Sequence, residues 1–395
     1  MPEHNGKVYL DSNATTPLCD EVKNAITEAL DYWGNPSSNH ELGRLAREKI
    51  ENARKQTASV IGADPEDVIF TSGGTESNHQ ILLSAVESEY DETWDLPHVI
   101  ISAVEHPSVT EPLKQWKKDG KCVFSVCPMN PINGAIDIEQ LVNLIQPKTC
   151  LVSVMLANNE TGVIQPIKYI SEIVRNKSDE LNKKIYVHTD AAQAIGKIDV
   201  NVNDLEVDYL TIVGHKFYGP RIGALFVKGL SESRTPLKPI VYGGGQERGY
   251  RSGTENTPMI VGLGAACSFV WNNLEQINKN LESTRNYLEH KLLDEFKDGE
   301  IIINFIKSDR LPNTCSVAFP AIVGTSSQLL AKCNSFVAST GAACHSQNTK
   351  ASSTLIASGC SEEIASKTLR LSVGRETTKA DIDTVIQELK VKLYS

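Results

Sequence analysis

Short apolar runs alternate with amphipathic stretches between Glu66 and Lys228. The runs are rich in β-branched residues and mostly continuous, which is typical of strands buried on both faces of a mainly parallel sheet. Helical periodicity fills several gaps, for example at 138–145 and 167–181. This alternation predicts a doubly wound α/β fold with helices flanking the sheet. The predicted strands are 68–71, 98–102, 122–126, 150–156, 185–189, 209–213 and 224–227.

The C-terminal third has a different pattern. A long helical pattern covers 256–296, and strand-like pieces follow at 301–304 and 314–319. The stretch His345–Thr354 is polar and has no apolar period, so we expect a loop there. Thr377–Asp383 carries the residue types of a capped helix start.

We expect two domains. Residues 1–260 form an N-terminal segment and a large domain, and residues 261–395 form a smaller α+β domain. The boundary falls between Asn256 and Ser268, inside a helix rather than in a linker. A chain of 395 residues is long enough for two or three domains of typical size.

Composition narrows the range of partners. The chain has 39 basic and 49 acidic residues and a net charge of −10, which argues against nucleic acid or an anionic membrane as a partner. Its longest apolar stretch, Met259–Val270, is too short to span a bilayer. No signal segment is recognised, so we expect a cytosolic protein with reduced cysteines. Nine cysteines without a Cys-x-x-Cys pair argue against a disulfide framework or a zinc site, and no metal is expected.

A glycine-rich motif, Ser72–Asn78, lies directly after a predicted strand and before a helical pattern. Glycines such as Gly74 let backbone N–H groups approach an anion, and a helix N-terminus favours negative charge. Thr75 adds a hydroxyl. The motif is therefore a candidate phosphate site, with a plain strand-to-helix turn as the alternative.

A second motif, His188–Gln193, follows the predicted strand 185–189. Ligands of open α/β sheets bind at the carboxyl ends of strands. A carboxylate there, Asp190, can pair with a protonated pyridine nitrogen. The alternative role for Asp190 is to cap a helix.

A third motif, Gly214–Pro220, follows the predicted strand 209–213 and contains Lys216. A lysine in a strand-end pocket can form a Schiff base, whereas an isolated lysine usually lies on the surface. A phosphate cradle, an acid and a lysine at successive strand ends together describe a site for pyridoxal 5'-phosphate, which requires all three.

With these motifs the chain resembles the class-V aminotransferase group of fold-type-I pyridoxal phosphate enzymes, and within it the NifS-like cysteine desulfurases and selenocysteine lyases. The resemblance implies a large domain with a mainly parallel seven-stranded sheet and a smaller C-terminal domain that carries a catalytic cysteine loop. Two segments, Leu210–Leu225 and Tyr242–Arg248, are most similar to animal selenocysteine lyases. The other matching segments are Tyr9–Pro17, Trp33–Ser38, Glu105–Ser108, Ala157–Gly162, Arg251–Thr254, Gly341–Ser346 and Leu369–Arg375.

The resemblance assigns roles around the cofactor ring. Lys216 matches the lysine that holds the cofactor and later moves protons. Asp190 matches the acid that keeps the pyridine nitrogen protonated, and Gln193 matches the donor to the ring oxygen. His106 matches the histidine stacked on the ring, which is also a candidate acid–base group. Without the resemblance, a histidine at a strand end and a capping amide are the alternatives for the last two.

The resemblance also implies contacts to the cofactor phosphate from Thr75 and His215. One departure is that Val213 stands where many relatives carry a serine, so that phosphate contact is expected to be absent or replaced. The loop Arg251–Thr254 matches a segment that reaches the phosphate of the neighbouring subunit through Thr254. A homodimer is therefore expected, with a surface turn as the alternative.

Three residues match the substrate side of the site. Arg370 corresponds to the arginine that binds the substrate α-carboxylate, for which a two-pronged guanidinium is suited. Asn159 corresponds to an amide that contacts cofactor and substrate, and Asn13 is a weaker candidate. For Arg370 an ordinary surface ion pair is the alternative.

Cys344 is the candidate catalytic cysteine. It lies among small and polar residues in Ser339–Ser346, and His345 can lower the pKa of its thiol toward the reactive thiolate. By contrast, Cys150 and Cys267 lie in apolar runs and are expected to be inert core residues.

The resemblance implies a lyase that decomposes L-selenocysteine to L-alanine and elemental selenium or selenide, with a selenium-acceptor protein as a further partner. The first alternative is a cysteine desulfurase that carries sulfur as a persulfide on Cys344. The second is a catalytically silent scaffold, against which the intact lysine, acid and arginine argue. Generic transamination is disfavoured, because a mobile thiol has no task in it.

Overall fold

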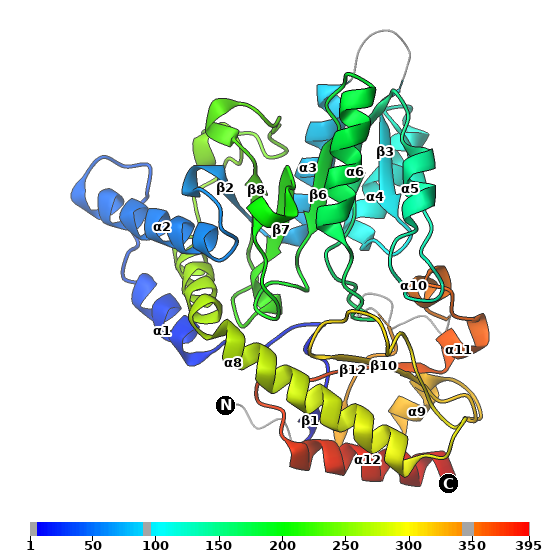
Figure 1. Ribbon diagram of the computed structural model, residues 1–395. Helices are drawn as coiled ribbons and strands as arrows, with labels where there is room; N and C mark the ends of the chain where they lie inside the picture. The colour runs from blue at the N-terminus through cyan, green and yellow to red at the C-terminus, as the bar shows by residue number, and fades with distance from the viewer. Residues whose placement is uncertain (1–5, 90–95, 342–350, 395) are drawn as a thin grey trace.

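A seven-stranded sheet forms the centre of the larger part of the molecule (Figure 1). The computed structural model describes residues 6–89, 96–341 and 351–394. The strand order is β2-β8-β7-β6-β5-β3-β4, and the seven strands predicted from the sequence are confirmed. The strands are β2 (Val68–Thr71), β3 (His98–Ser102), β4 (Val123–Cys127), β5 (Thr149–Ser153), β6 (Tyr186–Asp190), β7 (Tyr209–Val213) and β8 (Gly223–Val227).

The sheet is mainly parallel, as expected. Strand β8 runs antiparallel to both of its neighbours, and the other pairs are parallel. The apolar run predicted at 150–156 continues past the end of β5. There the N–H groups of Val154 and Leu156 each donate to β6, to the carbonyl oxygens of His188 and Asp190, at 3.0 Å. This extension carries the chain to the edge of the sheet where the candidate residues gather.

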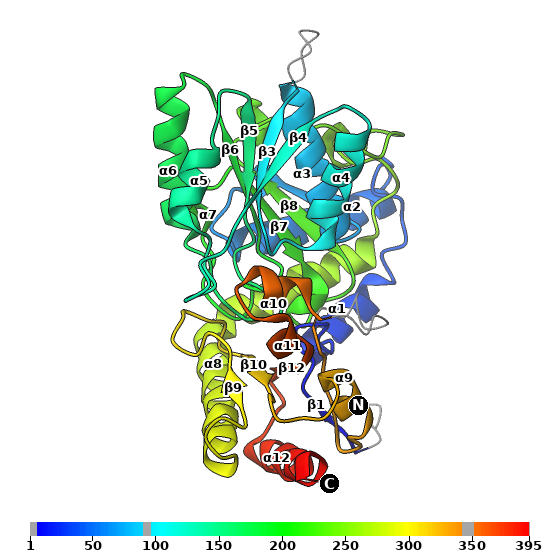
Figure 2. The same cartoon turned by 90° about the vertical axis from the view of Figure 1, so that its right-hand side faces the viewer.

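Helices cover both faces of the sheet (Figure 2). Helices α3 and α4 pack on one face, and α5, α6 and α7 pack on the other, so the buried apolar residues form two clusters. The helices predicted at 138–145 and 167–181 are confirmed as α5 and α6. The bounds are α3 (Gly74–Ser88), α4 (Pro107–Lys118), α5 (Ile138–Leu144), α6 (Ile167–Glu180) and α7 (Val202–Leu205).

The 39-residue helix α8 (Thr257–Glu295) connects the two parts of the molecule. It packs against α1 (Asp20–Ala29) and α2 (Glu41–Ser59) near its start and against α12 (Lys379–Tyr394) farther along (Figure 1). Gly264 lets α2 approach, because a Cβ there would meet the Ala53 backbone at 2.7 Å. In the described ranges, no helix has the length and apolar character needed to cross a membrane.

A smaller sheet lies below the large one in Figure 1. Its order is β12-β10-β9, with antiparallel pairing, and a parallel pair β1-β11 brings the N-terminal segment beside it. The strands expected near 301–304 and 314–319 are confirmed as β9 and β10. The bounds are β1 (Val8–Tyr9), β9 (Ile302–Ile303), β10 (Thr314–Ala318), α9 (Ser326–Ala331), β11 (Phe336–Val337), α10 (Ser353–Ala357), α11 (Glu362–Ser366) and β12 (Thr368–Ser372).

The prediction of a loop at His345–Thr354 is wrong in its last two residues. Residues 345–350 lie outside the described residues, but 353 and 354 begin α10, whose first turn is capped by Ser352 Oγ accepting from the N–H of Leu355 at 3.2 Å. A five-residue helix is too short to show an apolar period. The domain boundary at residue 260 stays a prediction, since α8 continues across it.

Candidate active site

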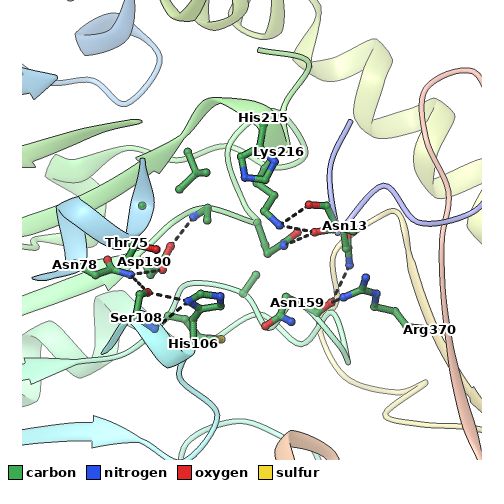
Figure 3. A pocket seen from close by; sticks show the side chains of 17 residues that line it. Asn13, Thr75, Asn78, His106, Ser108, Asn159, Asp190, His215, Lys216 and Arg370 are labelled. Carbon is green, nitrogen blue, oxygen red and sulfur yellow. Dashed lines mark hydrogen bonds between the residues drawn. The ribbon is translucent and has the colours of Figure 1, made fainter. Parts of the chain in front are cut away.

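A cavity of about 280 Å³ opens at the carboxyl ends of the parallel strands. This is where ligands bind in open α/β sheets. Strand β12 of the small sheet contributes to its wall, so both parts of the molecule build the site (Figure 3). The cavity brings together most of the residues predicted from the sequence: Asn13, Gly74, Thr75, His106, Asn159, Asp190, Gln193, His215, Lys216 and Arg370.

Lys216 reaches this cavity from η2 (Gly214–Lys216), the short 3-10 turn that follows β7. Its Nζ donates to the carbonyl oxygens of Asn13 at 2.7 Å and Ala14 at 2.9 Å. These bonds hold the amine at the cavity wall (Figure 3), so the surface position that the sequence left open does not apply.

Asp190 ends β6 and is 8% exposed. Its Oδ1 accepts from the N–H of Ala192 at 2.9 Å, so it does cap a turn, and its Oδ2 accepts from Nδ2 of Asn78 at 2.9 Å. Both partners are neutral donors, and the ion pairs among the described residues do not include Asp190. A buried carboxylate without a cation suits a ligand that brings its own positive charge, such as a protonated pyridine.

Asn78 connects Asp190 to the core of the sheet. Its Oδ1 accepts from Thr211 Oγ1 at 2.6 Å, and its Nδ2 also donates to Ser108 Oγ at 2.8 Å. Thr211 Oγ1 lies 3.2 Å from His188 Nε2, and because the threonine proton goes to Asn78, the histidine must be the donor there. Burial lowers the pKa of His188 to about 4, so its ring is neutral at pH 7. This network fixes the orientation of the Asp190 carboxylate.

His106 stands at the N-terminus of α4 and lines the cavity. Its Nδ1 accepts from the N–H of Ser108 at 3.1 Å, which places the ring proton on Nε2 when the imidazole is neutral. The ring is therefore held by the start of the helix, in a position to face a ligand in the cavity (Figure 3).

The neighbouring Glu105 is buried. Its Oε1 accepts from Ser102 Oγ at 2.5 Å and from the N–H of Met155 at 2.8 Å, while its Oε2 has no hydrogen-bond partner in the described part of the chain. Burial raises the pKa of Glu105 to about 8. The carboxyl group is therefore largely protonated at pH 7.

Gln193 lies in the turn after β6 and is held by two neighbours. Its Nε2 donates to the carbonyl oxygen of Asn13 at 2.9 Å, and its Oε1 accepts from Lys197 Nζ at 2.9 Å. The second N–H of this amide remains for a ligand in the cavity.

The start of α3 also lines the cavity, through Gly74 and Thr75. Beside Val213 a side chain at position 74 would clash, because a Cβ on Gly74 would lie 2.6 Å from Val213 Cγ2. The unpaired N–H groups of a helix start, together with the Thr75 hydroxyl, suit a phosphate. Val213 supplies no hydroxyl. Burial, with a contribution from Lys216, lowers the pKa of His215 to about 4, so this ring is a neutral hydrogen-bonding group.

Arg370 enters from β12 and is 2% exposed. Its Nη2 donates to Asp11 Oδ1 at 2.6 Å and its Nη1 to the carbonyl oxygen of Asn159 at 3.0 Å, while its Nε has no partner in the described ranges. A substrate carboxylate would share this guanidinium with Asp11. The Asn13 amide Nδ2 donates to the Asn159 carbonyl and to Thr314 Oγ1, so this amide is engaged with the protein.

The donor set thus fits pyridoxal 5'-phosphate: an amine, a buried carboxylate without a cation, an amide N–H and the N–H groups of a helix start. Comparison with known proteins agrees with this. The aminotransferase class-V family model matches residues 8–385. The chain belongs to the class-V aminotransferase family.

Three relatives place the chain within the family. A selenocysteine lyase of Xenopus laevis is 47% identical over 98% of this chain and 94% of its own length. A cysteine desulfurase of Rattus norvegicus is 38% identical over 96% of this chain and 81% of its own length. Among solved structures, a NifS-like protein superposes with a TM-score of 0.87 at 33% identity, covering 98% of this chain and 99% of the other.

Thr254 is not among the described residues that line the cavity of this class-V chain. Thr254 is exposed, and its loop is held against the start of α3 by an ion pair between Arg251 Nε and Glu76 Oε1 at 2.9 Å. Cys344 lies outside the described residues. The role of each stays a prediction.

A second cavity, of about 360 Å³, lies beside the first and shares His106 and Asn159 with it. Gly341 and Ala351 also line it, and these residues flank the segment that contains Cys344. The chain therefore leaves and re-enters the described structure next to the active site.

The residues that hold the predicted groups in place could not be assigned from the sequence. Asn78 and Ser108 belong to the predicted motifs but have no predicted role there, and the burial of Lys197 and Glu105 is not predicted. For Asn78 a signal existed: it lies four residues after Gly74, so both share one helix face. For Lys197 no local signal exists, because one of the partners of its buried amine is Asn13, which lies 184 positions away in the chain.

Proposed function

We propose that this protein is a pyridoxal phosphate-dependent lyase that converts L-selenocysteine into L-alanine and releases the selenium. The observation that carries the proposal is the cavity that joins Lys216, Asp190 and the start of α3 at adjacent strand ends. The identity of 47% with a selenocysteine lyase, against 38% with a cysteine desulfurase, supports the choice of substrate.

Each of these residues would contact a different part of the cofactor. Lys216 would bind its aldehyde, Asp190 its ring nitrogen and Gln193 its ring oxygen. His106 would lie against its ring, and the start of α3 at Gly74 would bind its phosphate. Thr75, His215 and Asn159 complete these contacts. When bound, the cofactor supplies an electron sink that stabilises negative charge at the substrate α-carbon.

Lys216 is the group that moves protons. Its Nζ lies 2.7 Å from the carbonyl oxygen of Asn13 and 2.9 Å from that of Ala14, which would hold the free amine beside a substrate in the cavity. It can remove the α-proton there and return a proton later, as a positioned general base and acid. His106 is a second group that can return a proton as alanine forms.

Arg370 binds the substrate carboxylate. A guanidinium can make paired N–H···O bonds to both carboxylate oxygens, which an ammonium cannot do. The existing bond to Asp11, at 2.6 Å, orients the guanidinium and keeps its charge compensated before substrate arrives. Asn159 and Asn13 complete this side of the site.

Cys344 accepts selenium from the substrate or assists its departure. The support is that the described residues on either side of its segment, Gly341 and Ala351, line a cavity shared with His106. A thiolate is the nucleophile needed for such a transfer. A selenium-acceptor protein then receives the product.

The active unit is a homodimer. The support is the position of Thr254, which is exposed and held outside its own cavity beside α3 by the Arg251–Glu76 ion pair. A partner subunit then receives the loop Arg251–Thr254 at its phosphate end.

The second candidate is a cysteine desulfurase that forms a persulfide on Cys344. The observation in its favour is the 38% identity over 96% of the chain with a cysteine desulfurase. Sulfur is a poorer leaving group than selenium, so this activity depends more strongly on the attacking thiolate.

The test combines spectroscopy with mass analysis. Wild-type protein incubated with pyridoxal phosphate should be yellow, and borohydride should remove the visible band and fix the cofactor on the peptide that contains Lys216. Lys216→Ala should fold without this band and release no alanine from L-selenocysteine. A Lys216→Ala variant with full turnover, or a cofactor fixed on another lysine, would show that the assignment is wrong.

A further inference from the structure

Lys197 is a buried lysine without an anionic neighbour. It lies in the turn after β6, is 3% exposed, and its carbonyl oxygen accepts from Nδ2 of Asn278 on α8 at 2.8 Å. Its Nζ donates to Gln193 Oε1 at 2.9 Å and to Asn13 Oδ1 at 3.3 Å. No ion pair of the described residues includes it, and a buried charge without a partner is costly.

The charges that act on Lys197 are both positive. Burial lowers its pKa well below the usual lysine value, and the cations of Lys216 and Arg370 lower it further. A neutral amine still has two N–H donors. Because Gln193 Oε1 and Asn13 Oδ1 are both acceptors, the two hydrogen bonds persist without the charge.

These bonds determine which way the Gln193 amide points. The carbonyl oxygen of Asn13 can only accept, so it requires Nε2 on its side, and the amine of Lys197 donates to Oε1 on the other side. A flipped amide would place Oε1 against the Asn13 carbonyl oxygen. Amide orientation follows from such a network.

Asn13 is held by the same amine. Its Oδ1 accepts from Lys197 and from Nδ2 of Asn313 at 2.9 Å, and its carbonyl oxygen accepts from Lys216 at 2.7 Å. Lys197 therefore supports two residues at the wall of the cavity. One is Gln193, whose amide faces the ligand, and the other is Asn13, whose carbonyl oxygen accepts from Lys216.

We propose that Lys197 is a positioning residue, a buried amine that orients Gln193 so that its remaining N–H meets the ring oxygen of the bound cofactor. This inference rests on the proposed function, because it concerns the pyridoxal phosphate site. It predicts that Lys197 acts through Gln193 and not through charge.

Misplacement of the Gln193 N–H should change the protonation of the bound cofactor. A donor to the ring oxygen stabilises negative charge on that oxygen, so it favours loss of the proton from the nitrogen that links the cofactor to Lys216. Loss of the donor should therefore raise the pKa at which the visible band of the bound cofactor titrates. The shift is expected to be about one pH unit, equivalent to a tenfold change in the equilibrium.

The experiment compares Lys197→Met with Lys197→Gln. The two side chains have the same length, but only glutamine has an N–H donor. Each holoenzyme is titrated spectroscopically between pH 5 and pH 10, and its apoprotein is melted to confirm the fold. Gln193→Ala and the double variant Lys197→Met/Gln193→Ala complete a double-mutant cycle.

We expect Lys197→Met and Gln193→Ala to raise the midpoint by similar amounts, the double variant to show no further rise, and Lys197→Gln to lie closer to wild type. An unshifted midpoint in a folded Lys197→Met protein would overturn the proposal, and so would additive shifts or failure of both Lys197 variants to fold. A wild-type protein that forms no visible band with pyridoxal phosphate would contradict the proposed function itself.

Discussion

Replacing Gly74 with alanine should weaken cofactor binding through a clash that a second substitution removes. A Cβ at Gly74 would lie 2.6 Å from Val213 Cγ2, well inside van der Waals contact. Val213 is buried and β-branched, so it cannot easily rotate away. The first turn of α3 must then move, and with it the N–H groups that bind the phosphate.

The magnitude follows from the cost of overpacking. One extra methyl group in a filled site costs about 1–3 kcal/mol. If the displaced helix start carries this cost into binding, the dissociation constant for pyridoxal phosphate should rise by roughly 5- to 150-fold. Fluorescence titration of the apoprotein measures the constant, and a thermal melt shows whether the fold is intact.

The matched control is Val213→Ala. The Cβ of Val213 lies 3.9 Å from the added atom, an ordinary contact, so removing the two methyl groups should relieve the clash. We expect Gly74→Ala/Val213→Ala to bind the cofactor nearly as well as Val213→Ala alone. Unchanged affinity in Gly74→Ala, or no recovery in the double variant, would refute the assignment of this turn as the phosphate cradle.

Four further predictions follow from the site. Asp190→Asn should retain cofactor but reduce alanine release by orders of magnitude, because an amide cannot stabilise a pyridinium charge; near-normal rates would leave Asp190 with its capping role alone. Arg370→Lys should raise KM for the amino acid, with a loss of roughly 1–3 kcal/mol for the charge-assisted bonds, while cofactor content stays constant; an unchanged KM would count against the carboxylate contact. Glu105→Gln should stabilise the protein increasingly as the pH rises. The pKa of Glu105 is raised from 4.5 to about 8 in the fold. The stability that Glu105 gives the wild-type protein is therefore fully present below pH 4.5 and is lost as the pH approaches 8, with an upper bound of roughly 5 kcal/mol. Melting temperatures of variant and wild type that differ by the same amount at every pH from 5 to 9 would disprove this. Cys344→Ala should abolish alanine release from L-cysteine and retain part of the release from L-selenocysteine, and equal losses on both substrates would contradict the proposed role of the thiol.

Patterns that depend on neighbouring residues were predictable. The buried strands are continuous apolar runs, so they were recognisable where helices cover both faces of the sheet. The strand-end motifs around Asp190 and Lys216 were predictable because a parallel sheet places the residues that follow its strands at one edge. The family resemblance added roles for Arg370 and Gln193, which are far apart in the chain.

Features that depend on packing between distant segments were not predictable. The bond between Lys197 and Asn13 joins residues 184 positions apart, and the bond between Asp11 and Arg370 joins residues 359 positions apart. The start of α10 at Ser353 was taken for a loop, because its five residues show no period. Such contacts are formed by the tertiary structure and leave no local pattern in the sequence.

The most direct test of the proposed function measures alanine release by the wild-type holoenzyme from L-selenocysteine and L-cysteine, side by side at equal concentration and without oxygen. A selenol is more acidic than a thiol and its bond to carbon is weaker, so selenium leaves Cβ with less assistance. We predict much faster alanine release from L-selenocysteine. Equal or faster release from L-cysteine, together with a persulfide trapped on Cys344, would contradict the proposal and identify a cysteine desulfurase.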